Sequence, residues 1–81
     1  MHEDIFEMAA AYLFHIVQNH PFVDGNKRTG AASAYIFLAM NNILFDADED
    51  EFAFMVLDVA DGRIGKSGIA QYLRENSSGT Y

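Results

Sequence analysis

AASAYIFLAM, at residues 31–40, decides the fold of this 81-residue chain. The segment contains no charged residue, so a helix formed there is apolar on almost every side. Such a helix is normally buried, and we expect this one to start near Asn26, to run to about Met40 and to lie at the centre of the molecule. Asn41 and Asn42 suit its end, because asparagine tolerates the left-handed conformation that often closes a helix.

An amphipathic segment precedes this central helix. Over residues 4–18 the apolar side chains recur at three- and four-residue spacing, which predicts a helix with one apolar face, made of Ile5, Ala9, Tyr12, Leu13, Ile16 and Val17. Asn19 and Pro21 end it, because the residue before a proline disfavours the helical conformation. Residues 21–25 are then expected to form a loop.

Two further helices are expected after the central one. Ile43–Phe45 is a short extended link, and either Asp46 or Asp48 can cap the third helix, since each has a glutamate three residues later. Gly62 ends this helix. Its inward stripe is Phe52, Met55, Val56 and Val59. A short last helix over residues 67–75 buries Ile69, Tyr72 and Leu73.

The chain therefore has the pattern of a small all-α domain. Residues 1–76 form the predicted domain, and residues 77–81 a flexible tail. Tyr12, Tyr35 and the methionines are most simply assigned to the core. The acidic run at residues 46–51 is best explained as a helix start, because acids stabilise the positive end of a helix dipole, and a metal loop fits it less well.

Composition excludes several classes of function. Twelve acids face five bases, for a net charge of -7, which argues against a nucleic-acid-binding protein. No segment has the length and apolarity of a membrane span, and the N-terminus is acidic where a secretory signal is basic. Cysteine is absent, so there is neither a disulfide framework nor a thiolate metal site, which fits the cytoplasm.

The most informative stretch for function is HPFVDGNKRTG, at residues 20–30. Lys27 and Arg28 stand at the start of the central helix, where cations oppose the helix dipole. Free backbone N–H groups also point outward there, and Gly25 lets the backbone approach a ligand closely. An anion, most simply a phosphate, would explain this arrangement, with Asn26 in the same turn.

Two more residues of this stretch add chemistry. His20 has a pKa suited to taking a proton from a hydroxyl that attacks phosphorus, and Asp24 is an oxygen ligand suited to Mg²⁺. Phe22 is an apolar anchor for the loop. Each feature also has an ordinary explanation: a capping histidine, a common turn, a solvated Lys-Arg pair. Their combination within eleven residues favours a phosphoryl-transfer site.

The same stretch resembles the active-site signature of the Fic/Doc family, most closely the Doc (death-on-curing) branch. The resemblance extends from about residue 4 to residue 75, through FLAMNN, FMVLDVADGRI and IAQYLREN. It implies a helical fold and a general base at His20, with Phe22 as the buried anchor and Asp24 serving Mg²⁺. It also implies an anion nest of Gly25, Asn26 and Lys27, with Arg28 holding phosphate of ATP.

Two positions select the branch. Adenylylating Fic proteins carry a glycine where this chain has Lys27, and a second arginine where it has Ala31. Doc-like proteins share both differences. The resemblance therefore implies a toxin of a toxin–antitoxin pair that transfers the terminal phosphate of ATP to a threonine hydroxyl of the translation factor EF-Tu. Pro21 and Gly25 match the Fic branch, so a protein adenylyltransferase (AMPylation) is the alternative.

Other features depart from the family pattern. Gly30 replaces the usual alanine, which costs up to about 1 kcal/mol in a helix and loosens its start. Doc-like chains generally carry further helical elements before the point where this sequence begins. Without them, apolar helix faces are expected to be exposed, and we expect a homo-oligomer, a swapped assembly or a bound antitoxin. A catalytically incomplete fragment that binds antitoxin or itself is the third hypothesis.

Overall fold

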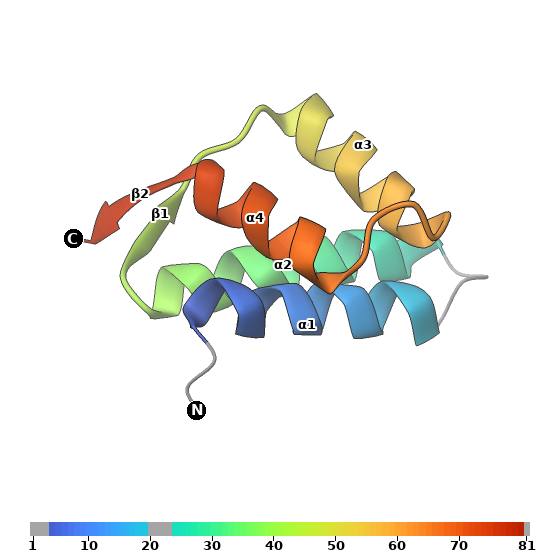
Figure 1. Ribbon diagram of the computed structural model, residues 1–81, viewed down its shortest axis with the longest axis horizontal. Helices are drawn as coiled ribbons and strands as arrows, with labels where there is room; N and C mark the ends of the chain where they lie inside the picture. The colour runs from blue at the N-terminus through green and yellow to red at the C-terminus, as the bar shows by residue number, and fades with distance from the viewer. Residues whose placement is uncertain (1–3, 20–23, 81) are drawn as a thin grey trace.

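The computed structural model describes residues 4–19 and 24–80, and describes the backbone alone for residues 19, 24–29, 79 and 80. Within these ranges it contains four helices and one small sheet (Figure 1). The helices are α1 (Ile5–Asn19), α2 (Asp24–Met40), α3 (Glu49–Ala60) and α4 (Lys66–Glu75). The strands are β1 (Ile43–Phe45) and β2 (Ser77–Thr80). The predicted helical class is confirmed.

The first helix begins with a reciprocal cap that the sequence analysis did not identify. The Asp4 carboxylate accepts a hydrogen bond from the Glu7 amide at 2.7 Å, and the Glu7 carboxylate accepts one from the Asp4 amide at 3.1 Å. Asp4 also forms an ion pair with Arg74 of α4, whose guanidinium lies 5.3 Å from the centre of the Phe6 ring. The start of α1 is thereby tied to the end of α4.

Local signals place both ends of α3 correctly. Asp48, one of the two caps considered, accepts a hydrogen bond from the Glu51 amide at 3.1 Å. Gly62 follows the helix with a φ of 81°, a conformation that glycine adopts without steric cost. Its amide donates to Val59, and the Arg63 amide donates to Asp58 at 2.8 Å, which together form a Schellman motif.

The core lies between α1 and the other three helices, each of which packs against it. The buried cluster includes Leu13 and Val17 of α1, Leu38 of α2, and Ile69 and Leu73 of α4. The predicted inward stripe of α3 is confirmed for Met55, Val56 and Val59, which are buried, whereas Phe52 is half-buried. The complete set of buried apolar residues is Ala9, Ala10, Leu13, Val17, Ala34, Leu38, Phe45, Met55, Val56, Val59, Ile69, Ala70 and Leu73.

The prediction that α2 is the buried central helix is wrong. Over residues 30–40, where the burial of α2 is described, one stripe is buried, formed by Gly30, Ala34 and Leu38 at four-residue spacing. On the other side Ile36 and Met40 are 55% and 77% exposed. The reason is geometric: α2 packs along one side of α1, and within the described residues no element covers its outer face (Figure 1).

Several residues assigned to the core are exposed instead. Tyr12 and Tyr35 are each half exposed, and Met8 and Met40 are exposed as well, whereas Met55 is buried. Helical spacing alone could not distinguish the face of α2 that contacts α1 from the equally apolar face opposite. The expectation that apolar helix faces are exposed is confirmed.

The C-terminal segment is a strand where a frayed tail was expected. Ser77–Thr80 pairs antiparallel with Ile43–Phe45, with Phe45 opposite Ser77 and an irregularity between Ile43 and Leu44. The Asp46 amide donates to the Asn76 carbonyl at 2.8 Å, which extends the pairing. The Ser77 hydroxyl donates to the Leu73 carbonyl at 2.7 Å and fixes the exit from α4. These bonds give otherwise free backbone groups their partners.

An aromatic cluster joins β1, α3 and α4. Phe45 packs edge-on against Phe52 with ring centres 5.0 Å apart, and Phe52 stacks on Tyr72 at an interplanar angle of 8°. The Tyr72 hydroxyl is buried and has no hydrogen-bond partner among the described residues. Burial raises the pKa of this phenol, and the negative charges of Glu51 and Asp48 raise it further.

Candidate functional site

The motif stretch lies where α1 ends and α2 begins. The two helices run antiparallel and side by side, so the last turn of α1 and the first turn of α2 meet at one end of the molecule (Figure 1). His20 and Phe22, the predicted base and anchor, fall within residues 20–23, outside the described residues. Their roles therefore remain predictions.

The structure corrects the start of the second helix. α2 begins at Asp24, two residues before the predicted start, so Asp24 and Gly25 are helical and do not form a turn. Gly25 and Asn26, a pair that normally signals a turn, thus lie within the first turn of the helix. The first turn of α2 is consequently Asp24, Gly25, Asn26 and Lys27, with Arg28 next.

The start of α2 at Asp24 is compatible with the predicted anion site, but it changes which backbone groups would form that site. The N–H groups of a first helical turn point out of the helix along its axis, and the positive end of the dipole lies at the same place. Lys27 is the last residue of this turn, and Arg28 follows it on the backbone. The predicted nest would therefore lie at a helix N-terminus, with Gly25 inside the first turn.

A cation at a helix start also has an ordinary explanation, and α4 provides the comparison. It begins with Lys66 after Gly65, which makes no side-chain cap. The Lys66 ammonium lies 5.5 Å from the centre of the Phe14 ring of α1, where a cation–π contact offsets its unfavourable place on the dipole. Lys66 thus has an aromatic partner that explains its position without an anion.

Two contacts hold the motif-bearing helix ends in place, and neither was anticipated. The Gln18 side-chain amide donates to the Val59 carbonyl near the end of α3, which anchors the last turn of α1. Gly30, close to the start of α2, lies against Val17 so closely that an added Cβ would stand 2.9 Å from Val17 Cγ2. The sequence analysis considered only the helix propensity of Gly30 and did not predict its contact with Val17. The contact between Gln18 and Val59 could not be predicted locally, because the two residues are 41 positions apart.

Metal binding at Asp24 is compatible with the chain's own residues. Among the described residues, no three His, Asp or Glu side chains gather in a way that would hold a metal ion. Mg²⁺ usually takes one or two protein carboxylates and completes its shell with substrate phosphates and water. A single aspartate at the start of α2 fits that kind of site.

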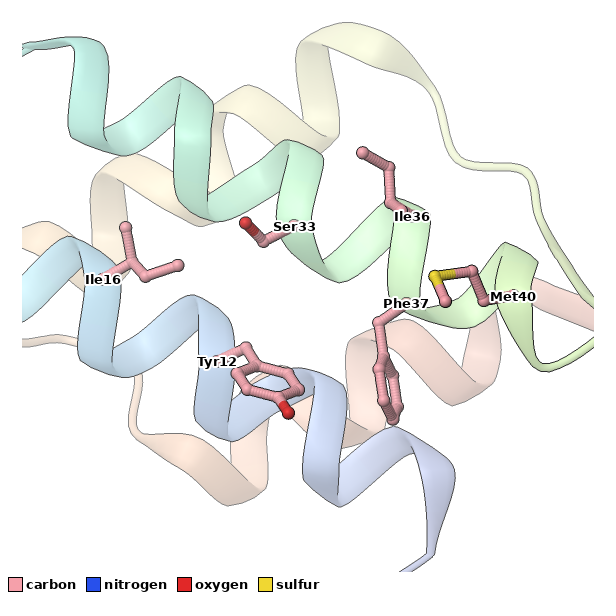
Figure 2. Close-up of a pocket in the computed structure, with 6 residues that line it drawn as sticks. All are labelled: Tyr12, Ile16, Ser33, Ile36, Phe37 and Met40. Carbon is pink, nitrogen blue, oxygen red and sulfur yellow. The ribbon is translucent and has the colours of Figure 1, made fainter.

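The outer side of α1 and α2 carries a separate, apolar groove (Figure 2). Its volume is about 300 Å³, and it is lined by Tyr12, Ile16, Ser33, Ile36, Phe37 and Met40. The lining contains no charged side chain and only two hydroxyl groups. It does not have the cations or amides that a nucleotide phosphate requires, so we do not assign it to the phosphate site.

Comparison with known proteins agrees with the motif. Residues 1–38 match the Fic/DOC family. The chain is 40% identical to the protein kinase doc of Escherichia phage P1 over 72 residues, which are 88% of this chain and 56% of that protein. It is 46% identical to the toxin Doc of Mycolicibacterium smegmatis over 46 residues, which are 57% of this chain and 35% of that protein.

The chain spans about half the length of the phage P1 protein, at 56%, and 35% of the length of the Mycolicibacterium smegmatis protein. In the part of the chain that the structure describes, no helix is both long and apolar enough to cross a membrane. The family match covers α1 and α2 up to residue 38, and both relatives carry the Doc name. The first part of the chain is therefore similar to the Fic/DOC family, and 88% of the chain is similar to a protein that carries the Doc name.

Proposed function

We propose that this chain is the motif-bearing part of a Doc-like toxin that transfers the terminal phosphate of ATP to a hydroxyl of a translation protein of the EF-Tu class. The observation that carries the proposal is the sequence DGNKR in the first turns of α2, which puts two cations at the positive end of a helix. The 40% identity to a protein named as a kinase supports the same chemistry.

The proposed step is a single phosphoryl transfer. The hydroxyl oxygen of the target attacks the γ-phosphorus while the bond to the β–γ bridging oxygen breaks, so ADP leaves and a phosphoester forms. His20 takes the hydroxyl proton. The first-turn amides of α2, with Lys27 and Arg28, hold the phosphates and offset their charge. Mg²⁺, when bound, neutralises phosphate charge, and Asp24 is the residue that would hold it.

An adenylyltransferase is the second candidate. Pro21 and Gly25 match the Fic branch, and the same amides and cations would then hold a nucleotide turned the other way. The bond formed would be to the α-phosphorus, with pyrophosphate leaving. Lys27 disfavours this alternative, because a long cation occupies the place where a glycine would leave room for phosphates.

A binding role without catalysis is the third candidate. Exposed apolar residues on α1 and α2 favour it, since such surfaces commonly contact other proteins. The expected partner of a Doc-like toxin is its antitoxin, and the expected location is the cytoplasm, where the translation factors are.

The deciding experiment labels the nucleotide at one of two positions. The chain is mixed with EF-Tu, Mg²⁺ and ATP that carries the label on either the γ- or the α-phosphate. Transfer of the γ-label alone supports the kinase, and transfer of the α-label supports the adenylyltransferase. Folded chain that transfers neither label supports the binding role, and binding of a cognate antitoxin is then the next measurement.

A further inference from the structure

One side chain joins the end of α1 to the end of α3. The Gln18 side-chain amide donates a hydrogen bond to the Val59 carbonyl, and the two residues are 41 positions apart. Among the described residues, the other side chains that donate to a backbone carbonyl do so four residues back along the chain; they are Asn41, Asn76 and Ser77. The Gln18 bond is thus unusual in this part of the chain, because it connects two different helices.

The Val59 carbonyl has a hydrogen-bond partner even without Gln18. Val59 is fully buried in the last turn of α3, and its carbonyl accepts a hydrogen bond from the Gly62 amide at 3.1 Å in the Schellman motif. A carbonyl oxygen has two lone pairs, so it can accept the Gln18 amide as well. Removing the Gln18 donor would not leave a buried acceptor unsatisfied, so the end of α3 does not need this bond in order to form.

A second contact on the same side of α1 reaches the start of α4. Phe14 and Gln18 are four residues apart, so they lie on one side of the helix. The Lys66 ammonium, on the first residue of α4, lies 5.5 Å from the centre of the Phe14 ring. The last turns of α1 are therefore held against both ends of the connection between α3 and α4 (Figure 1).

The two sides of the proposed phosphoryl-transfer site are anchored by different contacts. The first turns of α2, which would hold the phosphates, lead to Gly30, which packs against Val17. Gln18 lies in the last turn of α1, and His20, the predicted base, is the second residue after it along the chain. The contact of Gln18 with α3 therefore acts on the side of the site that would carry the base.

We propose that Gln18 is a positioning residue for phosphoryl transfer, whose bond to Val59 fixes the end of α1 from which the chain continues to the catalytic base. This inference rests on the proposed function. A misplacement of about 1 Å can cost on the order of 100-fold in rate, even when the altered residue lies outside the chemistry. Loss of the bond should therefore slow the chemical step and leave ATP binding unchanged, because the phosphates are assigned to α2.

Variants that differ in donor capacity test this proposal, with γ-labelled ATP and EF-Tu as substrates. Gln18→Met has nearly the same length and no donor, and it should lower the transfer rate at saturating ATP about 10- to 100-fold. The ATP dissociation constant should not change. Gln18→Glu should behave in the same way, because an ionised carboxylate has the shape of the amide but donates no hydrogen bond.

Gln18→Arg should restore most of the transfer rate, because a guanidinium donates hydrogen bonds and a cation is favourable at the carbonyl end of a helix. A role in packing alone would give the opposite order, with methionine tolerated better than the larger arginine. Gln71→Met is the matched control, because Gln71 is exposed and its amide bonds to Glu75 within α4. It should leave the transfer rate and the ATP affinity unchanged.

Amide hydrogen exchange measures the anchor independently of activity. In Gln18→Met the amides of Val17, Gln18 and Asn19 should exchange about 2- to 10-fold faster, the effect of one hydrogen bond on local opening, and the amide of Ile69 in α4 should not. Unchanged exchange, or equal transfer by wild type and Gln18→Met, overturns the positioning role. Wild-type chain that transfers no label overturns the proposed function instead, and the exchange rates then still decide whether Gln18 anchors α1.

Discussion

A Cβ placed on Gly30 would lie 2.9 Å from Cγ2 of Val17 and 3.4 Å from the carbonyl oxygen of Leu13. The helices α1 and α2 therefore approach each other closely at Gly30, the last residue of the motif stretch. Helix propensity alone suggests that glycine weakens this position. The contact gives glycine a positive role, because the absent side chain sets the spacing between the two helices.

Gly30→Ala is consequently expected to destabilise the protein by about 1 kcal/mol, because the cost of overpacking exceeds the gain in helix propensity. Val17→Ala removes the clashing atom, so in that background Gly30→Ala should become neutral or stabilising. Urea unfolding of the two single variants and the double variant measures this coupling. Additive effects of the two substitutions would contradict the packing account.

Tyr72→Phe should increase stability by up to about 1 kcal/mol, because it removes a buried hydroxyl that has no partner among the described residues and keeps the stacking on Phe52. Since the pKa of Tyr72 is raised, the folded protein holds the phenol proton more tightly than the unfolded chain does, so the stability of the wild type falls as the pH rises from the ordinary value of 10.0 through the raised pKa. The variant should therefore also lose less stability in alkali.

Urea unfolding at pH 7 and under alkaline conditions provides the measurement. Tyr12→Phe is the matched control, since Tyr12 is half exposed and its ring contact with Phe37 does not need the hydroxyl. A Tyr72→Phe variant less stable than the wild type at pH 7 would mean that the hydroxyl has a partner.

Asp4→Asn tests the connection between α1 and α4. Asparagine caps a helix about as well as aspartate, so this variant keeps the cap and removes the ion pair with Arg74. The backbone hydrogen bond from Glu7, and then Arg74, lower the pKa of Asp4. Its stabilising effect is therefore present at neutral pH and is lost as the pH falls through that lowered pKa.

The expected loss at pH 7 is at most about 1 kcal/mol, because both side chains are about half exposed to solvent. The difference between wild type and variant should disappear in acid well below pH 3.8, the ordinary pKa of an aspartate. Arg74→Gln should show the same dependence in urea unfolding. If the variant lost the same amount of stability at pH 7 and in acid, the loss would come from the cap of α1 and not from the ion pair.

His20→Ala should reduce phosphate transfer by roughly 10²- to 10⁴-fold, the usual contribution of a general base, and should leave the helical circular dichroism unchanged. His15→Ala is the control, because His15 is an exposed histidine of α1 outside the motif. Transfer that survives His20→Ala, or that His15→Ala abolishes equally, would remove His20 from the proposed mechanism.

Lys27→Ala and Arg28→Ala should each weaken ATP binding about tenfold, since each removes a charge-assisted contact to phosphate. Titration calorimetry measures the affinity, and added salt should reduce it in the wild type more than in the variants. Arg63→Ala removes an exposed cation outside the motif and should leave the affinity unchanged. Unchanged affinity in both motif variants would refute the anion site.

Local sequence signals predicted the elements of this fold well. The periodicity of residues 4–18 located α1, Asp48 and Gly62 located the ends of α3, and Asn42 takes the left-handed conformation with a φ of 63°. Each of these features depends on residues within one or two helical turns, which is why the sequence contains enough information to find them.

The features that were missed depend on distant partners. Ser77–Thr80 has no strand pattern of its own and pairs because Ile43–Phe45 lies beside it. The face of α2 that α1 covers is no more apolar than the face that stays exposed, so periodicity did not identify it. The start of α2 at Asp24 was missed for another reason, since a glycine and an asparagine normally signal a turn.

The ion pair between Asp4 and Arg74 has a practical consequence for immobilising the protein on a solid support and for designing fusion proteins. It brings the start of α1 beside the end of α4, and β2 leaves from the same end of the molecule (Figure 1). The fifteen residues of α1 place the motif end roughly 20 Å away. A tether, affinity handle or fluorescent protein joined beyond Asp4 or Thr80 would therefore lie away from the end of the molecule where α1 and α2 meet.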